Sequence, residues 1–408
     1  MNNDENFGTN SILEKIIMSK KAEEVARLDV VEIVNNLFAK LSAREQDVLV
    51  RRYGLHGQGR ETLENIGRLH QLTRERIRQI ETTSIKKIRE LKEMAEHLSA
   101  FKKVILNLLE EHGGIMERDF LLRVLLYFSA IESKSEDDTR RIHKLYLDFL
   151  VSKLLHNDFE LVGDSEHFKP SYKLRFFELS HYEEIIIELI EKIRACGKVL
   201  TTEALLQFIK GLSSYDKYRG KIQLTNTIDL SGILKNNYFE ENYSLVNNHK
   251  TFYSLLKAAK KIAQNQYGHW GLRHWREITP KTINDKIYLI LKNHREPIHF
   301  ATLAEKINGA NFDGKKANPA TVHNELILDE KYVLIGRGIY GLKEWGYQNG
   351  TVSDVIAEIL QETKEPLARD IIIEKVLAKR MVKKATIILA LMNKEKFEKN
   401  EAGYMLKN

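Results

Sequence analysis

The stretch from Thr62 to Arg89 carries side chains that can hydrogen-bond to the edges of DNA bases. Arg74, Glu75, Arg78 and Gln79 fall in the first two turns of a helix that the sequence predicts. Arginine can grip guanine O6 and N7, glutamine can pair with adenine, and glutamate can accept from the cytosine amino group. Because recognition helices meet base edges with their amino-terminal residues, this placement predicts base reading in a major groove.

Basic and hydroxyl side chains near these four positions are predicted to bind the DNA backbone. Such contacts set the position of a protein without reading sequence, and they release counterions condensed on phosphates. The predicted phosphate contacts are Arg51, Arg52, Arg60, Thr73, Arg76, Lys86, Lys87 and Arg89. Residues 41–92 hold 12 Lys and Arg against 7 Asp and Glu, in a chain of net charge +7. By charge alone, a solvated helix face would explain this window equally well.

Two helices and a turn must position these side chains. A short helix at about 62–69 precedes a turn at 70–72, and Gly67 is small enough to allow a close approach. Thr73 is a good N-cap for the second helix, since its hydroxyl can accept from a first-turn amide. On that helix one face gathers the side chains of Ile77, Ile80, Ser84 and Ile88. A plain surface helix laced with Arg and Glu pairs would not explain the capped turn and the short preceding helix together.

Residues 41–89 closely resemble region 4 of the bacterial primary sigma factors. The run LSAREQDVLVRRYGL at 41–55 is similar to the supporting helix pair, and TRERIRQIE at 73–81 is similar to the recognition helix. In that family the residues matching Arg74, Glu75 and Gln79 contact bases of the promoter −35 element. The resemblance also implies a grip on the flap of the RNA polymerase β subunit. Thr82, Thr83 and Ile88 depart from the family, where Ala or Leu is commoner.

Primary sigma factors carry a large helical region ahead of this block, which melts the −10 element with aromatic side chains. Only 40 residues precede Leu41 here, and their aromatic residues are Phe7 and Phe38. We therefore expect the −10 melting region to be lacking. The protein should not open promoters by the usual route unless its later domains replace that region.

After about residue 98 one pattern recurs: amphipathic helices, an aromatic strand residue, a polar turn, and a strand with Tyr-x-Leu. The examples are Phe159 with Tyr172 and Leu174, Phe239 with Tyr253 and Leu255, Tyr332 with Tyr340 and Leu342, and Phe397 with Tyr404 and Leu406. Helices followed by a two-stranded ribbon are typical of a winged helix. The alternative is that Tyr-x-Leu is ordinary sheet core, which many α+β domains share.

Residues 280–346 resemble the HARE-HTH winged helix. The quoted match includes PKTINDKIYLILKNHREPIHFATLAEKIN and the GRGIYGL turn. That family includes the amino-terminal domain of the RNA polymerase delta subunit, and its members are polymerase-associated or DNA-associated adaptors. The resemblance implies that the two halves of this chain serve one machine.

The predicted fold class is mainly α with small β wings, a helix-turn-helix followed by serial winged-helix-like domains. The predicted domains are a helical arm at 1–40, the helix-turn-helix at 41–98, winged-helix-like domains at 100–177 and 181–256, a connector at 257–279, the HARE-HTH domain at 280–347, and a last winged-helix-like domain at 350–408. Trp270 and Trp275 are expected to dock the connector on a neighbouring domain.

Other classes of site find no support in the sequence. His269 and His274 are five residues apart, which is wrong for a same-face metal pair. We find no phosphate loop, paired-acid constellation or nucleophile elbow, so we predict no catalytic residue, no metal and no small-molecule cofactor. The single cysteine, Cys196, fits a reducing compartment, and no apolar run is long enough to span a bilayer. The expected location is the cytoplasm.

The leading hypothesis is a bacterial transcription protein, not an enzyme, that binds duplex DNA at −35-type elements and acts with RNA polymerase. One rival is an interaction scaffold that binds polymerase and touches DNA only incidentally. Another is the DNA-targeting subunit of a restriction or mobile-element system. The sequence does not specify the DNA site, nor activation as against repression.

Overall fold

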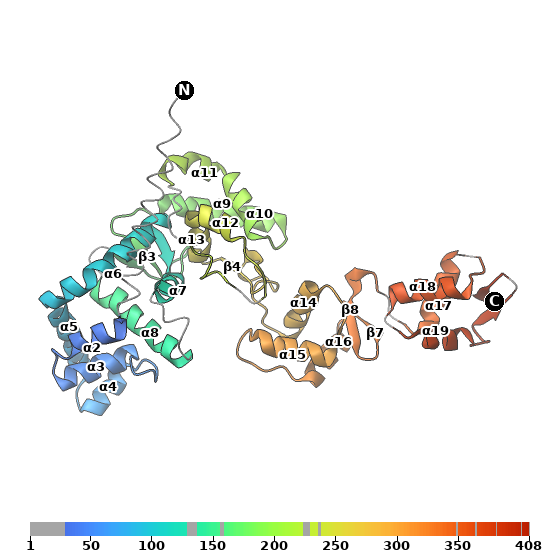
Figure 1. The fold of residues 1–408 in the computed structure, drawn as a ribbon, viewed down its shortest axis with the longest axis horizontal. Coiled ribbons are helices and arrows are strands. Elements are labelled where there is room, and N and C mark those ends of the chain that lie inside the picture. Colours follow the sequence, from blue (N-terminus) through green and yellow to red (C-terminus); the bar gives the residue numbers. More distant parts are fainter. Residues whose placement is uncertain are drawn as a thin grey trace, which may run out of the picture. The chain divides into compact units, whose positions relative to one another are not determined.

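The computed structural model describes residues 29–128, 137–155, 159–222, 229–235, 238–347, 350–363, 365–380, 382–400 and 402–407. It is mainly helical with small antiparallel sheets, as the sequence predicts. The chain forms two compact units, Met1–His274 and Trp275–Asn408 (Figure 1). Within the described ranges, no helix is long and apolar enough to cross a membrane.

Four helices form the first part of unit 1, which we call the HTH block. They are α2 (Val30–Phe38), α3 (Ala43–Tyr53), α4 (Leu63–His70) and α5 (Arg74–Arg89). Helix α3 begins with a capping box between Ser42 and Glu45 and ends at Gly54, whose φ of 69° suits glycine. Helix α2 lies within the helical arm predicted at 1–40. The earlier part of the predicted arm, including Phe7, lies outside the described residues.

Two modules complete unit 1. Module A contains α6 (Lys92–Glu111), β1 (Ile115–Glu117), α7 (Arg118–Phe128), α8 (Asp137–Phe149), the π-helix η1 (Leu150–Leu154), β2 (Phe159–Val162) and β3 (Ser171–Leu174). Module B contains α9 (Ser180–Cys196), α10 (Thr202–Lys210), α11 (Ser213–Tyr218), the 3-10 helix η2 (Arg219–Lys221), α12 (Tyr243–Asn248), α13 (Lys250–Ala258), β4 (Ile262–Gln264) and β5 (Trp270–Leu272).

Two further modules form unit 2, each around its own apolar core. Module C contains α14 (Ile283–His294), β6 (Ile298–His299), α15 (Phe300–Ala310), α16 (Pro319–Leu328), β7 (Tyr332–Gly336), β8 (Ile339–Leu342) and the 3-10 helix η3 (Lys343–Trp345). Module D contains α17 (Val352–Thr363), α18 (Arg369–Lys379), α19 (Lys384–Leu391), β9 (Phe397–Lys399) and β10 (Tyr404–Leu406).

The four modules share one strand register. Each closing hairpin carries an aromatic-x-Leu strand, and its Leu pairs with a large apolar residue of the first hairpin strand: Leu174 with Phe159, Leu272 with Ile262, Leu342 with Tyr332, and Leu406 with Phe397. The aromatic residue pairs with a short segment between the first two helices: Tyr172 with Met116, Trp270 with Leu200, Tyr340 with Ile298, and Tyr404 with Leu367. Helix, strand, two or more helices and a hairpin is the order that a winged helix has.

The structure corrects three sequence predictions. Tyr253 and Leu255 lie in helix α13, where both are buried, and the hairpin of module B follows at 262–272. Residues 257–279 therefore include that hairpin rather than forming only a connector. Its turn contains Gly268, whose φ of 83° suits glycine. Helix α6 also runs unbroken across the predicted boundary at 98–100.

The HTH block packs directly on module A. The ring of Phe149 meets those of Phe38 and Tyr53, with centroids 5.6 and 4.8 Å away. The buried carboxylate of Asp148 accepts from Arg60 of the HTH block and from Arg118 of module A. Apolar burial and a shared carboxylate thus both join the HTH block to module A, and α8 and η1 form the contact surface between them.

Module B is anchored to module A by buried polar contacts. The ammonium group of Lys250 on α13 lies 2.9 Å from a carboxylate oxygen of Glu111, and both side chains are buried. Helix α13 also packs against β1 of module A. A buried ion pair is costly to break because each partner would be left charged without compensation. These contacts fix α13 on the neighbouring module.

His112 gives unit 1 a predictable acid sensitivity. Its ring is fully buried, its Nδ1 lies 2.7 Å from the carbonyl of Leu108, and burial lowers its pKa to about 3. The unfolded chain binds a proton below about pH 6.5 whereas the folded chain does not, so stability falls as pH drops. We predict that this residue alone removes about 1.4 kcal/mol per pH unit between roughly pH 6 and pH 4.

Calorimetric unfolding of the full chain across this pH range checks the prediction. The variant His112→Leu should show a shallower pH dependence than the wild type, and the exposed His274→Leu should match the wild type. Parallel curves for His112→Leu and the wild type would contradict a neutral buried ring.

Candidate nucleic-acid interface

The turn between α4 and α5 is fixed by backbone geometry and two caps. Gln71 ends α4 with a φ of 56°, and the hydroxyls of Thr62 and Thr73 each accept from an amide three residues ahead, at 3.2 Å. A Cβ on Gly67 would lie 2.7 Å from the carbonyl oxygen of Leu72. Only glycine therefore allows the turn to fold back onto α4, and the close approach predicted at Gly67 is made by this turn.

Helix α5 is held by one face. Ile77 is buried with Val48 of α3 and Ile66 of α4 in a small core. Further along α5 the buried residues are Ser84, Ile85 and Ile88. Ile80, expected on the buried face, is only half-buried and packs at the margin of the core. The observed face is thus rotated slightly, because η1 of module A packs against α5 and Ile85 is enclosed.

The four predicted base-reading residues lie on exposed surface of α5. Arg74, Glu75, Arg78 and Gln79 are all solvent-exposed. The guanidinium of Arg78 donates to the Glu75 carboxylate at 2.7 to 3.1 Å, and this hydrogen bond lowers the pKa of Glu75. Arg76 donates to the side-chain Oε1 of Gln79 at 3.1 Å, which leaves the side-chain Nε2 of Gln79 available as a donor. The helix therefore presents both donors and acceptors at its amino end.

Half of the predicted phosphate contacts share this open surface. Thr73, Arg76, Lys86 and Lys87 are exposed. Lys87 reaches back to Glu45 of α3 at 2.5 Å, and Lys86 lies 3.9 Å from Glu90. The Lys86–Glu90 pair is exposed and contributes little to stability, so Lys86 can exchange its partner for a phosphate at small cost. Lys87 would have to leave the largely buried carboxylate of Glu45.

The other half is engaged inside the chain. Arg51 pairs with Asp47 and Glu61, and Arg52 donates to the Glu61 carbonyl while lying 3.6 Å from Glu81. Arg60 pairs with Asp148, and Arg89 donates to the carbonyl of Lys153 at the end of η1. These four guanidinium groups hold the block together and dock it on module A. The sequence could not separate them from free cations, since their partners are up to 88 residues away.

A positioning contact not predicted from the sequence joins α3 to α5. The hydroxyl of Tyr53 donates to the Glu81 carboxylate, and Arg52 lies beside the same carboxylate. Burial is the first cause that raises the pKa of Tyr53, and the Glu81 contact adds to it. The contact fixes the rotation of α5 next to its exposed polar residues. The sequence indicated a role for Glu81 only through its place as the last residue of the TRERIRQIE run.

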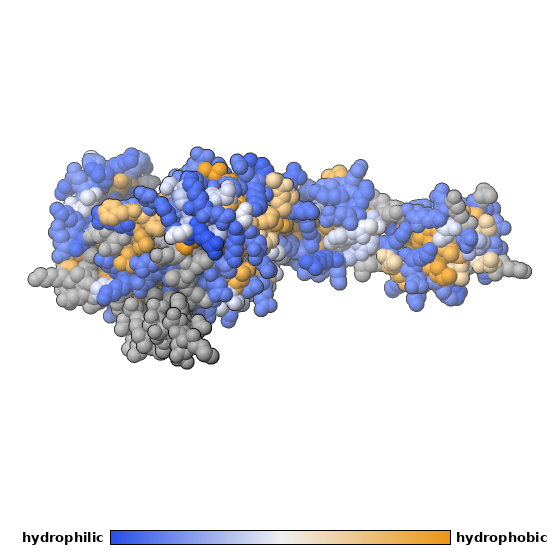
Figure 2. Space-filling model, turned by 90° about the horizontal axis from the view of Figure 1, so that it is seen from above, coloured by the Kyte–Doolittle hydropathy of each residue, from blue (hydrophilic) through white to orange (hydrophobic). Residues whose placement is uncertain are grey.

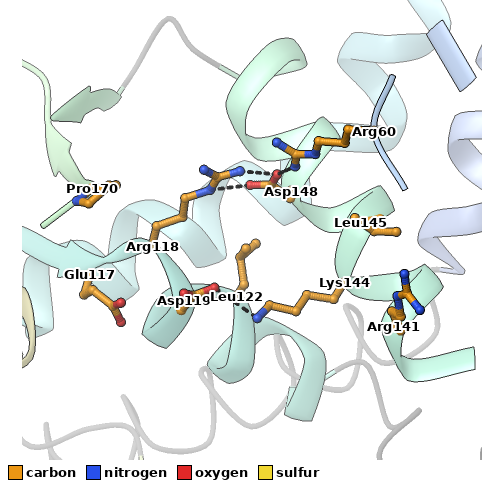
Figure 3. Close-up of a pocket in the computed structure, with 10 residues that line it drawn as sticks. All are labelled: Arg60, Glu117, Arg118, Asp119, Leu122, Arg141, Lys144, Leu145, Asp148 and Pro170. Atoms are coloured by element: carbon orange, nitrogen blue, oxygen red, sulfur yellow. Dashed lines mark hydrogen bonds and ion pairs between the residues drawn. The ribbon is translucent and has the colours of Figure 1, made fainter. Parts of the chain in front are cut away.

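A pocket of about 320 Å³ lies where the HTH block meets module A (Figure 3). In Figure 3 the side chains of Arg60 and Arg118 converge on Asp148, and Lys144 points to Asp119. Its charged side chains thus largely neutralise one another, which suits a docking joint rather than a ligand site. Among the described residues no group of His, Cys, Asp and Glu is placed to hold a metal ion.

A protein-family model matches the same part of the chain. Residues 37–90 match the family "Sigma-70, region 4". The RNA polymerase sigma factor SigA1 of Synechococcus elongatus is 48% identical over 67 residues, which cover 16% of this chain and 17% of that protein. SigA of Microcystis aeruginosa is 46% identical over 67 residues, or 16% of each chain.

The chain thus spans about a sixth of the length of the curated relatives it matches. No solved structure matches the chain significantly. The family match does not reach residues 280–346, where the HARE-HTH resemblance stays a prediction. The HTH block of this chain contains a Sigma-70 region 4 domain at residues 37–90.

Proposed function

We propose that this protein is a sigma-factor-like transcription protein that reads duplex DNA through α5 and acts with bacterial RNA polymerase. The observation that carries the proposal is the exposed polar surface on the first two turns of α5, opposite the buried Ile77 and Ile88. Arg74, Glu75, Arg78 and Gln79 read base edges, and the target is a −35-type promoter element. The domain match at 37–90 supports this role.

The phosphate contacts proposed for the same complex are those with exposed side chains. Thr73 and Arg76 flank the amino end of α5, where the helix dipole also favours a phosphate. Lys86 and Lys87 extend the basic surface two turns further along the helix. Arg51, Arg52, Arg60 and Arg89 act indirectly, because their contacts set the pose of α5 within the block.

The polymerase partner is proposed from the region 4 domain, and the β flap is the contact surface that the resemblance suggests. We further propose that the protein adjusts promoter recognition or the stability of the promoter complex. The winged-helix-like modules, including the HARE-HTH-like module C, then serve as adaptors to the same machine. The cytoplasm is the compartment where these partners meet.

Two rivals fit the same block with different partners. As an interaction scaffold, the protein would bind polymerase with only incidental DNA contact. As a DNA-targeting subunit of a restriction or mobile-element system, it would work with a catalytic partner chain. A pull-down with the β flap in the presence of nuclease tests the polymerase contact that both readings share. Preference of the purified protein for one duplex sequence over a scrambled one then favours the DNA reader, and the absence of any preference favours the scaffold. Promoter-restricted crosslinking across the genome would exclude the second.

Base reading is tested by replacing Arg74, Glu75 and Gln79 with Ala. Each base contact contributes about 1 to 3 kcal/mol of discrimination. We predict that the triple variant loses its preference for the selected site over a scrambled duplex, while salt-sensitive binding to both remains. Site selection from a random duplex library, followed by competition binding, measures the preference. A triple variant that still selects the wild-type site would refute the assignment of these residues.

Phosphate binding is tested by comparing two cations of α5, one exposed and one hydrogen-bonded within the chain. The variant Lys86→Ala should weaken binding to every duplex alike and reduce the slope of log K against log salt by about 1. The matched control Arg89→Ala removes a cation three residues away that contacts Lys153, so its slope should equal the wild type. Fluorescence titrations at several salt concentrations give both slopes. Equal slope changes in the two variants would count against the proposed division.

A further inference from the structure

In both modules of unit 1, the helix that precedes the closing hairpin packs against another part of the chain. In module A this element is α8 with η1, which packs against α2 and α5 of the HTH block. In module B it is α13, which packs against β1 of module A and holds Glu111 through Lys250. Neither helix is free to enter a DNA groove. Within this chain, the position that winged helices can use for DNA is used for docking on protein.

Module D presents the same element, α19, with an apolar surface that no described residue of unit 2 covers. Its sequence, KATIILAL, is mostly apolar, and Ile387 and Leu391 enter the core of the module. On the outside, Leu389 is 70% exposed and Met392 is 66% exposed. In Figure 2 the end of the molecule formed by module D carries an apolar area. Exposed apolar side chains grouped on one helix indicate an interaction site.

Lysines surround this apolar face. Lys383 and Lys384 lie at the amino end of α19, and Lys394 follows its carboxyl end. All three are exposed, and none makes an ion pair with another described residue. Unpaired cations around an apolar centre favour a partner whose apolar side chains are flanked by carboxylates.

The chemistry of α19 argues against DNA as the occupant. The exposed side chains of the helix and its end include Ala385, Thr386, Leu389 and Met392. They lack the Arg, Glu and Gln side chains that are proposed to read base edges on α5. A polar DNA groove would offer no apolar surface to Leu389 and Met392. An apolar protein surface would remove these side chains from water, which stabilises a complex by about 25 cal/mol per Å² of apolar area buried.

We propose that α19, with Leu389 and Met392 at its centre and Lys383, Lys384 and Lys394 at its rim, is a docking site for an acidic amphipathic helix of a partner protein. Helix α19 has eight residues and is thus about 12 Å long, which matches two to three turns of a partner helix. The partner's apolar stripe contacts Leu389 and Met392, and its carboxylates contact the lysines. This site is independent of DNA reading by α5.

The test uses the full-length protein and two labelled synthetic peptides of about four turns. Both carry Leu at helical i, i+3, i+4 and i+7 spacing, and the remaining positions are Glu in one and Lys in the other. Fluorescence anisotropy should show binding of the Leu/Glu peptide at least tenfold tighter than the Leu/Lys peptide. No binding of the Leu/Glu peptide, or equal binding of the two, overturns the proposal.

Matched variants locate the site. Leu389→Ser and Lys384→Glu should each weaken Leu/Glu peptide binding about tenfold. The controls Phe176→Ser and Lys210→Glu change an exposed apolar residue and an exposed lysine of unit 1, and they should bind as the wild type does. Equal losses in variants and controls would show nonspecific attraction to a basic protein and overturn the site. Circular dichroism confirms that each variant remains folded.

Two further readouts separate the other occupants. Light scattering of the wild type and Leu389→Ser measures oligomeric state, and a dimer that only the wild type forms would replace the proposed partner by a second copy of the chain. Duplex binding of Leu389→Ser should equal that of the wild type. A fall in duplex affinity would instead show that α19 binds DNA, and it would overturn the proposed protein partner.

Discussion

Everything proposed for DNA depends on the burial of one face of α5. Ile77 packs with Val48 and Ile66, and Ile88 is buried further along the helix. Because apolar side chains on that face leave water, the opposite face must point outward with its arginines, glutamate and glutamine. The contact between Gly67 and the Leu72 carbonyl and the two threonine caps then set where the helix begins. Rotation and start together determine which side chains a duplex would meet.

Local patterns predicted the local parts of this arrangement well. The Thr73 cap, the short α4 and the exposed polar face of α5 follow from residues within about ten positions of one another, and the structure has them. The engagement of Arg60 and Arg89 could not be predicted, because Asp148 and the Lys153 carbonyl come from another module. Charge alone gives a cation's sign and not its partner. Long-range packing therefore decides which basic residues remain available to phosphates.

The winged-helix-like modules show the same division between local and distant information. The aromatic-x-Leu pattern located the hairpins of modules A, C and D, where Tyr172, Tyr340 and Tyr404 lie on the second hairpin strand. It failed in module B because Tyr253-x-Leu255 also suits a buried helix, and both residues pack into the core from α13. Trp270 takes the strand position instead and donates to the Thr202 hydroxyl at 2.9 Å. A two-residue spacing cannot distinguish these outcomes without the turn that follows.

The way η1 stops has a consequence for α5. The last carbonyls of any helix have no partner within it, and Arg89 takes the one at Lys153. If the chain continued its winding beyond Leu154, that oxygen would be claimed by an amide of its own helix. The carboxyl end of α5 would then lose its hydrogen bond to η1, although the sequence of neither helix had changed. The length of η1 thus controls the orientation of α5. Insertions near residue 155 would therefore change how α5 presents its exposed polar residues.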